Sequence, residues 1–201
     1  MIEIETLNLE ELMVKFNLRG PSLLEAIYFM PISSTDKREQ KILYELANSI
    51  KSENILEIGT YSGAQALGFR INVLTAHIWT MDITQEMGLD DKNHWVLSEK
   101  ESGKECVGYS QIHRLLRNSN NIESYQDLPQ MDFAYVDGNH SYEAVLADSE
   151  HVVNIMKEGG LVCWHDYDLG RKDVDVAKAL YTFFDARPLL KPYVIANTQL
   201  I

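Results

Sequence analysis

The stretch that decides the fold covers residues 131–166, which read MDFAYVDGNHSYEAVLADSEHVVNIMKEGGLVCWHD. Residues 133–136 are apolar and rich in aromatic and β-branched side chains, as is typical of a strand buried on both faces of a parallel sheet. Apolar residues then recur at helical spacing over residues 142–156, and Gly159 and Gly160 are expected to end that helix. Residues 161–164 are a second apolar run. The stretch therefore predicts a strand–helix–strand unit with a right-handed crossover.

Titratable side chains follow both of these predicted strands. Asp137 and His140 come just after the first strand, and His165 and Asp166 just after the second. In open parallel sheets, ligands bind beyond the carboxyl ends of the strands, so we expect the four side chains to share one site. Either Asp alone could simply cap a turn. Two strand ends that each carry an Asp and a His favour a functional site.

The composition fits one α/β domain with no nucleic-acid or membrane partner. The chain has 201 residues, of which 45% are hydrophobic and 24% charged. A net charge of −12 argues against binding to nucleic acid or to an anionic membrane. No apolar run is long enough to span a bilayer, and the first residues do not resemble a signal peptide. Two cysteines form no disulfide framework, so a cytoplasmic location is expected.

The two ends of the chain predict additions to this domain. Residues 1–34 are expected to form accessory helices, near residues 9–16 and 22–30, that pack on the sheet edge, form a substrate lid or contact a second subunit. Residues 35–201 form the main domain, and Asp36 followed by Glu39 predicts a capping box at its first helix. After a helix over residues 174–184, strands at 193–196 and 198–201 predict a short C-terminal antiparallel edge, which the N-terminal helices or a second copy of the chain would complete.

A second informative stretch, residues 54–63, reads NILEIGTYSG. It predicts a buried strand, a tight turn in which Gly59 and Gly63 let the backbone approach a ligand, and the start of a helix at Ala64. The dinucleotide fingerprint G-x-G-x-x-G begins with a glycine where this chain has Glu57. A carboxylate there would repel a pyrophosphate and would suit an ammonium group, which disfavours a nicotinamide cofactor.

The next two predicted strands also end on polar residues. Asp82 follows a strand over residues 78–81, where an acid can hydrogen-bond a ribose diol. Residues 85–110 are expected to form a surface loop with at most one short helix. Asn118 and Ser119 follow a strand over residues 112–116, where they could contact an adenine edge or simply form turns.

Together these motifs resemble the class I S-adenosylmethionine-dependent methyltransferases, over roughly residues 35–180. The most similar group is the small O-methyltransferase-like family related to sugar and macrolide O-methyltransferases. The resemblance implies a Rossmann-like fold, with a doubly wound, mostly parallel sheet. It also implies that the cofactor-binding residues are Glu57, Gly59, Tyr61, Ser62, Gly63, Asp82, Asn118, Ser119 and Asp137.

The resemblance also implies roles for the residues after the last two strands. His140 would be the general base and Asp137 its catalytic partner, and in metal-dependent relatives Asp137, His165 and Asp166 would bind a divalent ion. Such relatives generally carry an acid or an amide where this chain has His165. An imidazole weakens a site for Mg²⁺ and favours Mn²⁺ or Zn²⁺, or it indicates a site that works without metal.

The expected function is methyl transfer from S-adenosylmethionine to a hydroxyl of a small molecule, such as a sugar, polyketide or phenol. Two alternatives stay open at this point. One is a protein that binds S-adenosylmethionine without catalysis. The other, which Glu57 disfavours, is a nicotinamide-dependent oxidoreductase.

Overall fold

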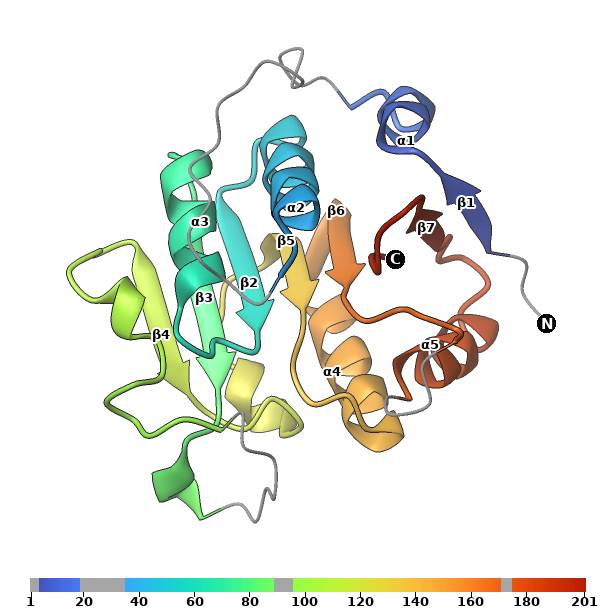
Figure 1. Cartoon of the computed structure of the whole chain (residues 1–201). Coiled ribbons are helices and arrows are strands. Elements are labelled where there is room, and N and C mark those ends of the chain that lie inside the picture. Colours follow the sequence, from blue (N-terminus) through green and yellow to red (C-terminus); the bar gives the residue numbers. More distant parts are fainter. Residues whose placement is uncertain (1–3, 19–34, 89–95, 171–174) are drawn as a thin grey trace.

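The central sheet of the protein is entirely parallel. The computed structural model describes residues 4–18, 35–88, 96–170 and 175–201 (Figure 1). Five strands are paired in the order β4-β3-β2-β5-β6, which confirms the predicted mostly parallel α/β fold. They are β2 (Asn54–Ile58), β3 (His77–Asp82), β4 (Ile112–Leu116), β5 (Met131–Val136) and β6 (Met156–Trp164).

Helices cover both faces of this sheet (Figure 1). On one face lie α2 (Lys37–Ser49) and α3 (Ala64–Asn72), and on the other lie α4 (Tyr142–Asn154) and α5 (Val176–Asp185). Successive side chains of β5 alternate between the two cores, with Phe133 and Tyr135 against α2 and α3, and Ala134 and Val136 against α4 and α5. Burial on both sides is the reason why this strand reads as an uninterrupted apolar run.

The order of the strands creates a crevice between β2 and β5. The chain proceeds outward from β2 to β4 on one side and from β5 to β6 on the other. The connections after β2 and β5 therefore diverge, and this is the position at which doubly wound sheets bind ligands.

The glycine pair after α4 has a different role from the predicted one. The helix ends at Asn154, and Gly159 and Gly160 lie inside β6, which begins at Met156. The register between β5 and β6 shifts near this point. Gly159 has a φ of 80°, and a Cβ on Gly160 would come within 2.9 Å of the Asp132 carbonyl oxygen. The glycines therefore permit an irregularity of the strand, and the prediction that they end the helix was wrong.

The segment between β3 and β4 contains only short helical turns in its described part. These are the 3₁₀ helices η1 (Gln85–Met87) and η2 (Lys104–Cys106), as expected for a surface loop. A third 3₁₀ helix, η3 (Ile122–Tyr125), connects β4 to β5.

The two ends of the chain meet in a small sheet of their own. Strand β1 (Glu5–Leu7) pairs in parallel with β7 (Tyr193–Ile195). Helix α1 (Leu9–Lys15) follows β1, as its spacing predicted, and opens with a capping box between Asn8 and Glu11. The predicted helix over residues 22–30 lies outside the described residues, and the division of the chain after residue 34 stays a prediction.

The predicted antiparallel C-terminal edge is replaced by this arrangement. Strand β7 pairs with β1 in a separate two-stranded sheet and not with the main sheet. Within β6 itself, Trp164 exchanges two backbone hydrogen bonds of 2.9 and 3.2 Å with Ile201, and just after the strand the Tyr167 amide donates to the Gln199 carbonyl at 3.0 Å. Among the described residues, no helix combines the length and the apolar character that a bilayer crossing requires.

Candidate active site

The turn after β2 touches the turn after β5. The Gly59 amide donates to the Met81 carbonyl, and its φ of +95° suits glycine. A Cβ at this position would come within 2.1 Å of the Asp137 carbonyl oxygen. Gly63, with a φ of +88°, is packed equally closely, because its Cβ would lie 2.5 Å from Cys106 Sγ. Any side chain at either glycine would therefore collide with neighbouring protein atoms, and their predicted approach to a ligand stays a prediction.

Glu57 is a fully buried carboxyl group at the base of this crevice. Its Oε2 accepts a 2.5 Å hydrogen bond from the Thr80 hydroxyl, and its Oε1 has no partner among the described residues. Burial raises the pKa of Glu57 to about 8; the Thr80 hydrogen bond opposes this change, and the nearby Asp137 and Asp82 add to it. An unpartnered buried acceptor of this kind suits a cationic ligand group.

Asp82 lies beside the glycine turn, at the end of β3. Its Oδ2 accepts from the backbone amide of Tyr61, and its Oδ1 from that of Ile83, both at 2.8 Å. Burial raises the pKa of Asp82, although these backbone hydrogen bonds oppose the change. The carboxylate is thus held in one orientation next to the turn, with acceptor capacity left for hydroxyl groups.

Asn118 and Ser119 form the turn after β4. Asn118 Oδ1 accepts from the Asn120 amide at 3.0 Å, and Asn120 Nδ2 donates to Asp148 Oδ1 at 3.0 Å. Asp148, on α4, is buried, and burial raises its pKa to about 6. Hydrogen bonds from Ser119 and Asn120 act in the opposite direction and lower this pKa. The sequence analysis missed Asp148, whose signal was an acid on the apolar face of a predicted helix. An adenine-binding role for this turn stays a prediction.

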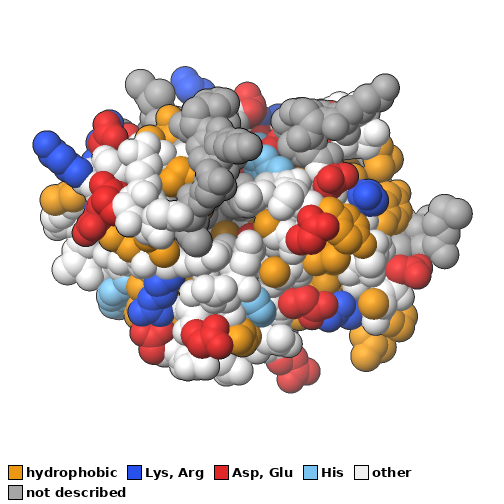
Figure 2. Space-filling model, turned by 90° about the horizontal axis from the view of Figure 1, so that it is seen from below, with side chains coloured by type: hydrophobic (Ala, Val, Ile, Leu, Met, Phe, Trp, Pro, Cys, Tyr) orange, Lys and Arg blue, Asp and Glu red, His pale blue; other side chains and the backbone are white. Residues whose placement is uncertain are grey.

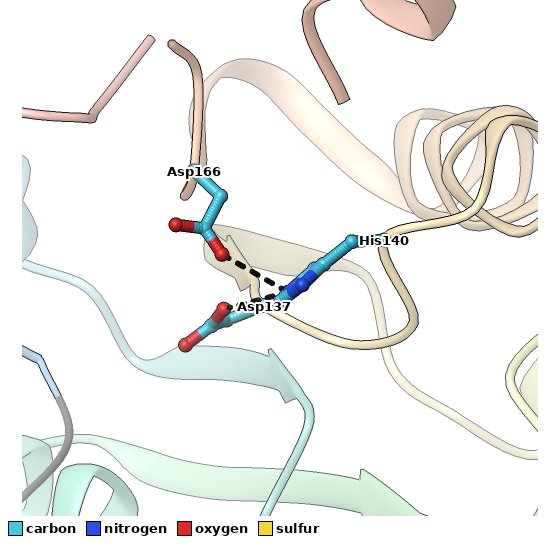
Figure 3. A group of neighbouring side chains, drawn as sticks. All are labelled: Asp137, His140 and Asp166. Carbon is cyan, nitrogen blue, oxygen red and sulfur yellow. Dashed lines mark hydrogen bonds and ion pairs between the residues drawn. The ribbon is translucent and has the colours of Figure 1, made fainter. Parts of the chain in front are cut away.

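The polar residues after β5 and β6 do converge, as Figure 3 shows. His140 Nε2 lies 3.4 Å from Asp137 Oδ1 and 3.3 Å from Asp166 Oδ2. One ligand atom from each of these three residues falls within 4.8 Å of the others, a grouping in which a metal ion could be held. Asp166 has a φ of 57°, a left-handed conformation that Asp tolerates better than most residues.

The charges in this cluster stabilise one another. Burial by itself would raise the pKa of Asp137, but hydrogen bonds and charge from His140 and His165 lower it to about 2. The hydrogen bond with Asp137 raises the pKa of His140, although burial opposes this change. The interactions therefore favour an ionised Asp137 and make the neighbouring imidazoles more basic.

His165 has two carboxylate neighbours of its own. Its Nδ1 lies 3.3 Å from Asp137 Oδ1, and its Nε2 lies 3.1 Å from Glu39 Oε2. Burial would lower the pKa of His165, but these two carboxylates raise it to about 10. The residues grouped closely enough to hold an ion are Asp137, His140 and Asp166, and the expected metal set of Asp137, His165 and Asp166 stays a prediction.

Glu39 is the second functional candidate that the sequence analysis missed. Asp36 does cap α2, through its Oδ1 and the Arg38 amide, but Glu39 does not complete the predicted capping box. Its side chain is buried and turned toward His165 and the amide of Gln199. No local pattern could indicate this contact, because its partners lie 126 and 160 positions further along the chain.

Tyr135 supports the other oxygen of Asp137. Its hydroxyl donates to Asp137 Oδ2 at 3.1 Å and lies 3.3 Å from the Thr35 hydroxyl. Asp137 is therefore held on both oxygens, and its carboxylate has a single well-defined orientation.

A cavity of about 410 Å³ opens next to Tyr167, the residue after Asp166. Its walls come from β1, β7, the segment after β6, and α5, and the lining residues are Ile4, Thr6, Tyr167, Asp168, Leu169, Tyr181, Val194, Thr198 and Gln199. This volume is in the range of small-molecule sites. Figure 2 shows the face at which the sheet strands end, where acidic, basic and hydrophobic side chains are interspersed.

Known structures share this fold. A candidate caffeoyl-CoA O-methyltransferase from Staphylococcus aureus aligns with a TM-score of 0.58 and 18% identity, over 91% of this chain and 84% of that one. An O-methyltransferase from Bacillus cereus, solved with S-adenosylhomocysteine (SAH), aligns with a TM-score of 0.58 and 14% identity, over 90% and 79%. The methyltransferase PaMTH1 from Podospora anserina, also solved with SAH, aligns with a TM-score of 0.57 and 16% identity, over 90% of this chain and 79% of that one.

The sequence comparisons locate the family in the same region. No curated protein matches the chain. A family model described as a methyltransferase domain matches residues 56–167, more than half of the chain, and this segment runs from β2 to just beyond Asp166. The structure therefore has the class I methyltransferase fold, and the chain belongs to this methyltransferase-domain family.

Proposed function

We propose that the protein is an S-adenosylmethionine-dependent O-methyltransferase that acts on a hydroxyl group of a small molecule. The observation that carries the proposal is the direct contact between the two turns, in which a Cβ on Gly59 would lie 2.1 Å from the Asp137 carbonyl oxygen. This contact sets the buried acceptor Glu57 and the His140 cluster on the two sides of one crevice. A methyl donor on one side would thereby face a base on the other.

The residues of the crevice fit the cofactor. The unpartnered Oε1 of Glu57 suits its ammonium group, and Asp82 has acceptor capacity for its ribose hydroxyls. Gly59 and Gly63 leave room where any side chain would collide with neighbouring atoms. Solved structures of the same fold carry SAH. When bound, S-adenosylmethionine supplies an electrophilic methyl group.

The chain's own contribution is to orient the acceptor and to remove its proton. The Nε2 of His140 faces carboxylate oxygens of Asp137 and Asp166, which accept hydrogen bonds, so this nitrogen carries the ring's proton. Nδ1 is then the nitrogen that takes the proton from the acceptor hydroxyl. The carboxylates stabilise the imidazolium that forms, as in other His–Asp pairs. Deprotonation makes the hydroxyl oxygen nucleophilic enough to attack the methyl group.

Asp137, His140 and Asp166 could together hold a divalent cation, which would polarise and orient the acceptor hydroxyl. The Asp137 oxygen in this grouping also lies 3.3 Å from His165 Nδ1. A softer ion such as Zn²⁺ would also bind His140 and remove the base. We therefore assign no step to a metal.

Two further features support a small-molecule acceptor and a reducing compartment. The cavity of about 410 Å³ beside Tyr167 has the size that such an acceptor needs. Cys106 and Cys163 are both buried and unpaired, which is consistent with the proposed cytoplasmic location.

The first test is a calorimetric titration with SAH, with NAD in a parallel experiment. We expect SAH to bind and NAD not to bind. Binding of NAD alone would favour the oxidoreductase alternative, and binding of neither ligand to folded protein would refute the methyltransferase proposal. Turnover of S-adenosylmethionine with catechol, a glucoside and a hydroxylated polyketide then separates catalysis from binding alone. Binding of SAH without turnover of any of the three would favour a non-catalytic role.

A further inference from the structure

We propose that Asp148 is a positioning residue, which holds the turn after β4 from the side of α4 and thereby lets this turn bind the adenosine half of S-adenosylmethionine. This role deepens the proposed methyltransferase function and rests on it. The turn consists of residues 117–121, between β4 and η3. Asp148 would act on the cofactor only through the turn, because its side chain is buried and hydrogen-bonded to it.

The turn over residues 117–121 lies beside Asp82, the acid expected to bind the ribose of the cofactor. The amide of Arg117 donates a 3.0 Å hydrogen bond to the Asp82 carbonyl oxygen. Glu57 lies near the end of β2, Asp82 ends β3 and the turn follows β4, and these three strands are neighbours in the sheet. A ligand with its ammonium group at Glu57 and its ribose at Asp82 would therefore extend its base toward the turn.

Asp148 engages two polar side chains of this turn. It is 1% exposed, and its Oδ1 accepts a 3.0 Å hydrogen bond from Asn120 Nδ2. The Ser119 side chain donates a second hydrogen bond to the carboxylate. Asn120 Nδ2 also lies 3.4 Å from the Ala144 carbonyl oxygen, one helical turn before Asp148. These two side chains therefore anchor the turn to α4, and Ser119 would serve the cofactor through the position of the turn.

Helix α4 holds the turn at a second point and also contacts the turn after β5. His151 Nδ1 lies 3.1 Å from the Ser119 carbonyl oxygen. A Cβ on Gly138 would come within 3.2 Å of Asp148 Oδ2, so this oxygen packs against the turn after β5. The Asp148 side chain thus contacts the turns after β4 and β5 together. Its loss is expected to loosen the turn after β4 and to leave Glu57, on β2, unchanged.

The test separates the two halves of the cofactor by calorimetry with two ligands. SAH has an amino-acid part and an adenosine part, whereas methylthioadenosine keeps the adenosine part and lacks the ammonium group. We expect Asp148→Ala to weaken the binding of both ligands to the same extent, by about tenfold, the value of a hydrogen bond lost at a charged group. Glu57→Gln should weaken the binding of SAH alone. A residue that serves only the stability of the fold would not produce this pattern.

Two further variants make the test specific. Asn120→Ala breaks the same hydrogen bond from the side of the turn, so it should weaken the binding of both ligands, and its effect should not add to that of Asp148→Ala in the double variant. Glu45→Gln is the matched control, because Glu45 is also a buried acid on a helix but contacts Lys41, at 3.8 Å. It should leave both affinities within twofold of the wild type.

The outcomes distinguish this role of Asp148 from the proposed function. Unchanged binding of methylthioadenosine in Asp148→Ala and Asn120→Ala would overturn the inference, and so would an equal loss in Glu45→Gln. If Asp148→Ala does not fold, Asn120→Ala carries the test, because Asn120 is exposed. Failure of the wild type to bind either ligand would refute the proposed function itself, and the inference with it.

Discussion

Thr80 Oγ1 donates a 2.5 Å hydrogen bond to Glu57 Oε2, across the neighbouring strands β3 and β2 in which the two residues are direct partners. The Thr60 and Thr80 hydroxyls are in turn 2.6 Å apart. One oxygen of Glu57 is therefore fixed by the protein, and the other has no hydrogen-bond partner among the described residues. This division makes Glu57 the most informative residue for testing cofactor binding.

Binding of SAH is expected to release a proton from Glu57. The pKa of the buried carboxyl is raised to about 8, and an ammonium group beside it would lower that pKa. Near pH 7 the carboxyl therefore ionises on binding, and affinity rises with pH until about pH 8. Calorimetry in buffers of different ionisation enthalpy measures the released proton.

Glu57→Gln should abolish this proton release and weaken SAH binding by roughly 10- to 100-fold, the value of a hydrogen bond to a charged group. Glu45→Gln, a buried acid away from the crevice, should change neither quantity. Equal proton release in the wild type and in Glu57→Gln would contradict the assigned role.

Gly59→Ala should be far more destabilising than Gly108→Ala. The two glycines have nearly equal φ values, +95° and +94°, so the backbone strain is matched. A Cβ on Gly108 meets nothing within 4 Å, whereas one on Gly59 would lie 2.1 Å from a backbone oxygen. We expect Gly108→Ala to cost about 1–2 kcal/mol, and Gly59→Ala clearly more, in the free energy of unfolding measured with urea. Similar costs would show that the contact between the turns is not tight.

His140→Asn should lower kcat by roughly 10²- to 10⁴-fold, the usual contribution of a positioned base. SAH should still bind with near wild-type affinity, because the cofactor residues are unchanged. His113→Asn is the control: its Nε2 lies 3.0 Å from His77 Nδ1, at β3 and β4, and it has no contact with the cluster. Unchanged turnover of His140→Asn would exclude this residue as the base.

The cluster should also give the protein a characteristic dependence of stability on pH. The folded-state pKa of His165 is raised to about 10. Its stabilisation is therefore complete below the unfolded value of about 6.5 and is lost as pH rises toward 10. Asp137 behaves oppositely, because its pKa is lowered to about 2, so its stabilisation is lost as pH falls toward that value.

Urea denaturation of the wild type and of His165→Asn, from pH 6 to pH 10, measures the part of this pH dependence that comes from His165. The difference in unfolding free energy between the two proteins should shrink as pH rises. A constant difference would show that His165 is not held in its charged form.

Local patterns in the sequence were sufficient to predict most helices and strands, and to predict which edge of the sheet carries the site. The apolar run ending at Val136 and the glycine turn after Ile58 predicted buried strands, and parallel strands place their ends together. The order of hydrophobic residues thus determined the sheet, the positions of Glu57 and Asp82, and the meeting of Asp137 with His140 and Asp166.

Tertiary contacts decided what these residues can do. Glu39 was expected to cap its own helix, but its partners His165 and Gln199 come from distant segments, and their proximity depends on the packing of α2 against β6 and on the path of the C-terminal turn. The pairing of β7 with β1 likewise joins residues from opposite ends of the chain, which no local pattern specifies. Periodicity reports only which face of an element is buried, so the sequence determined the sheet and its site, whereas the partners of each buried charge, and hence its protonation, were set by tertiary packing.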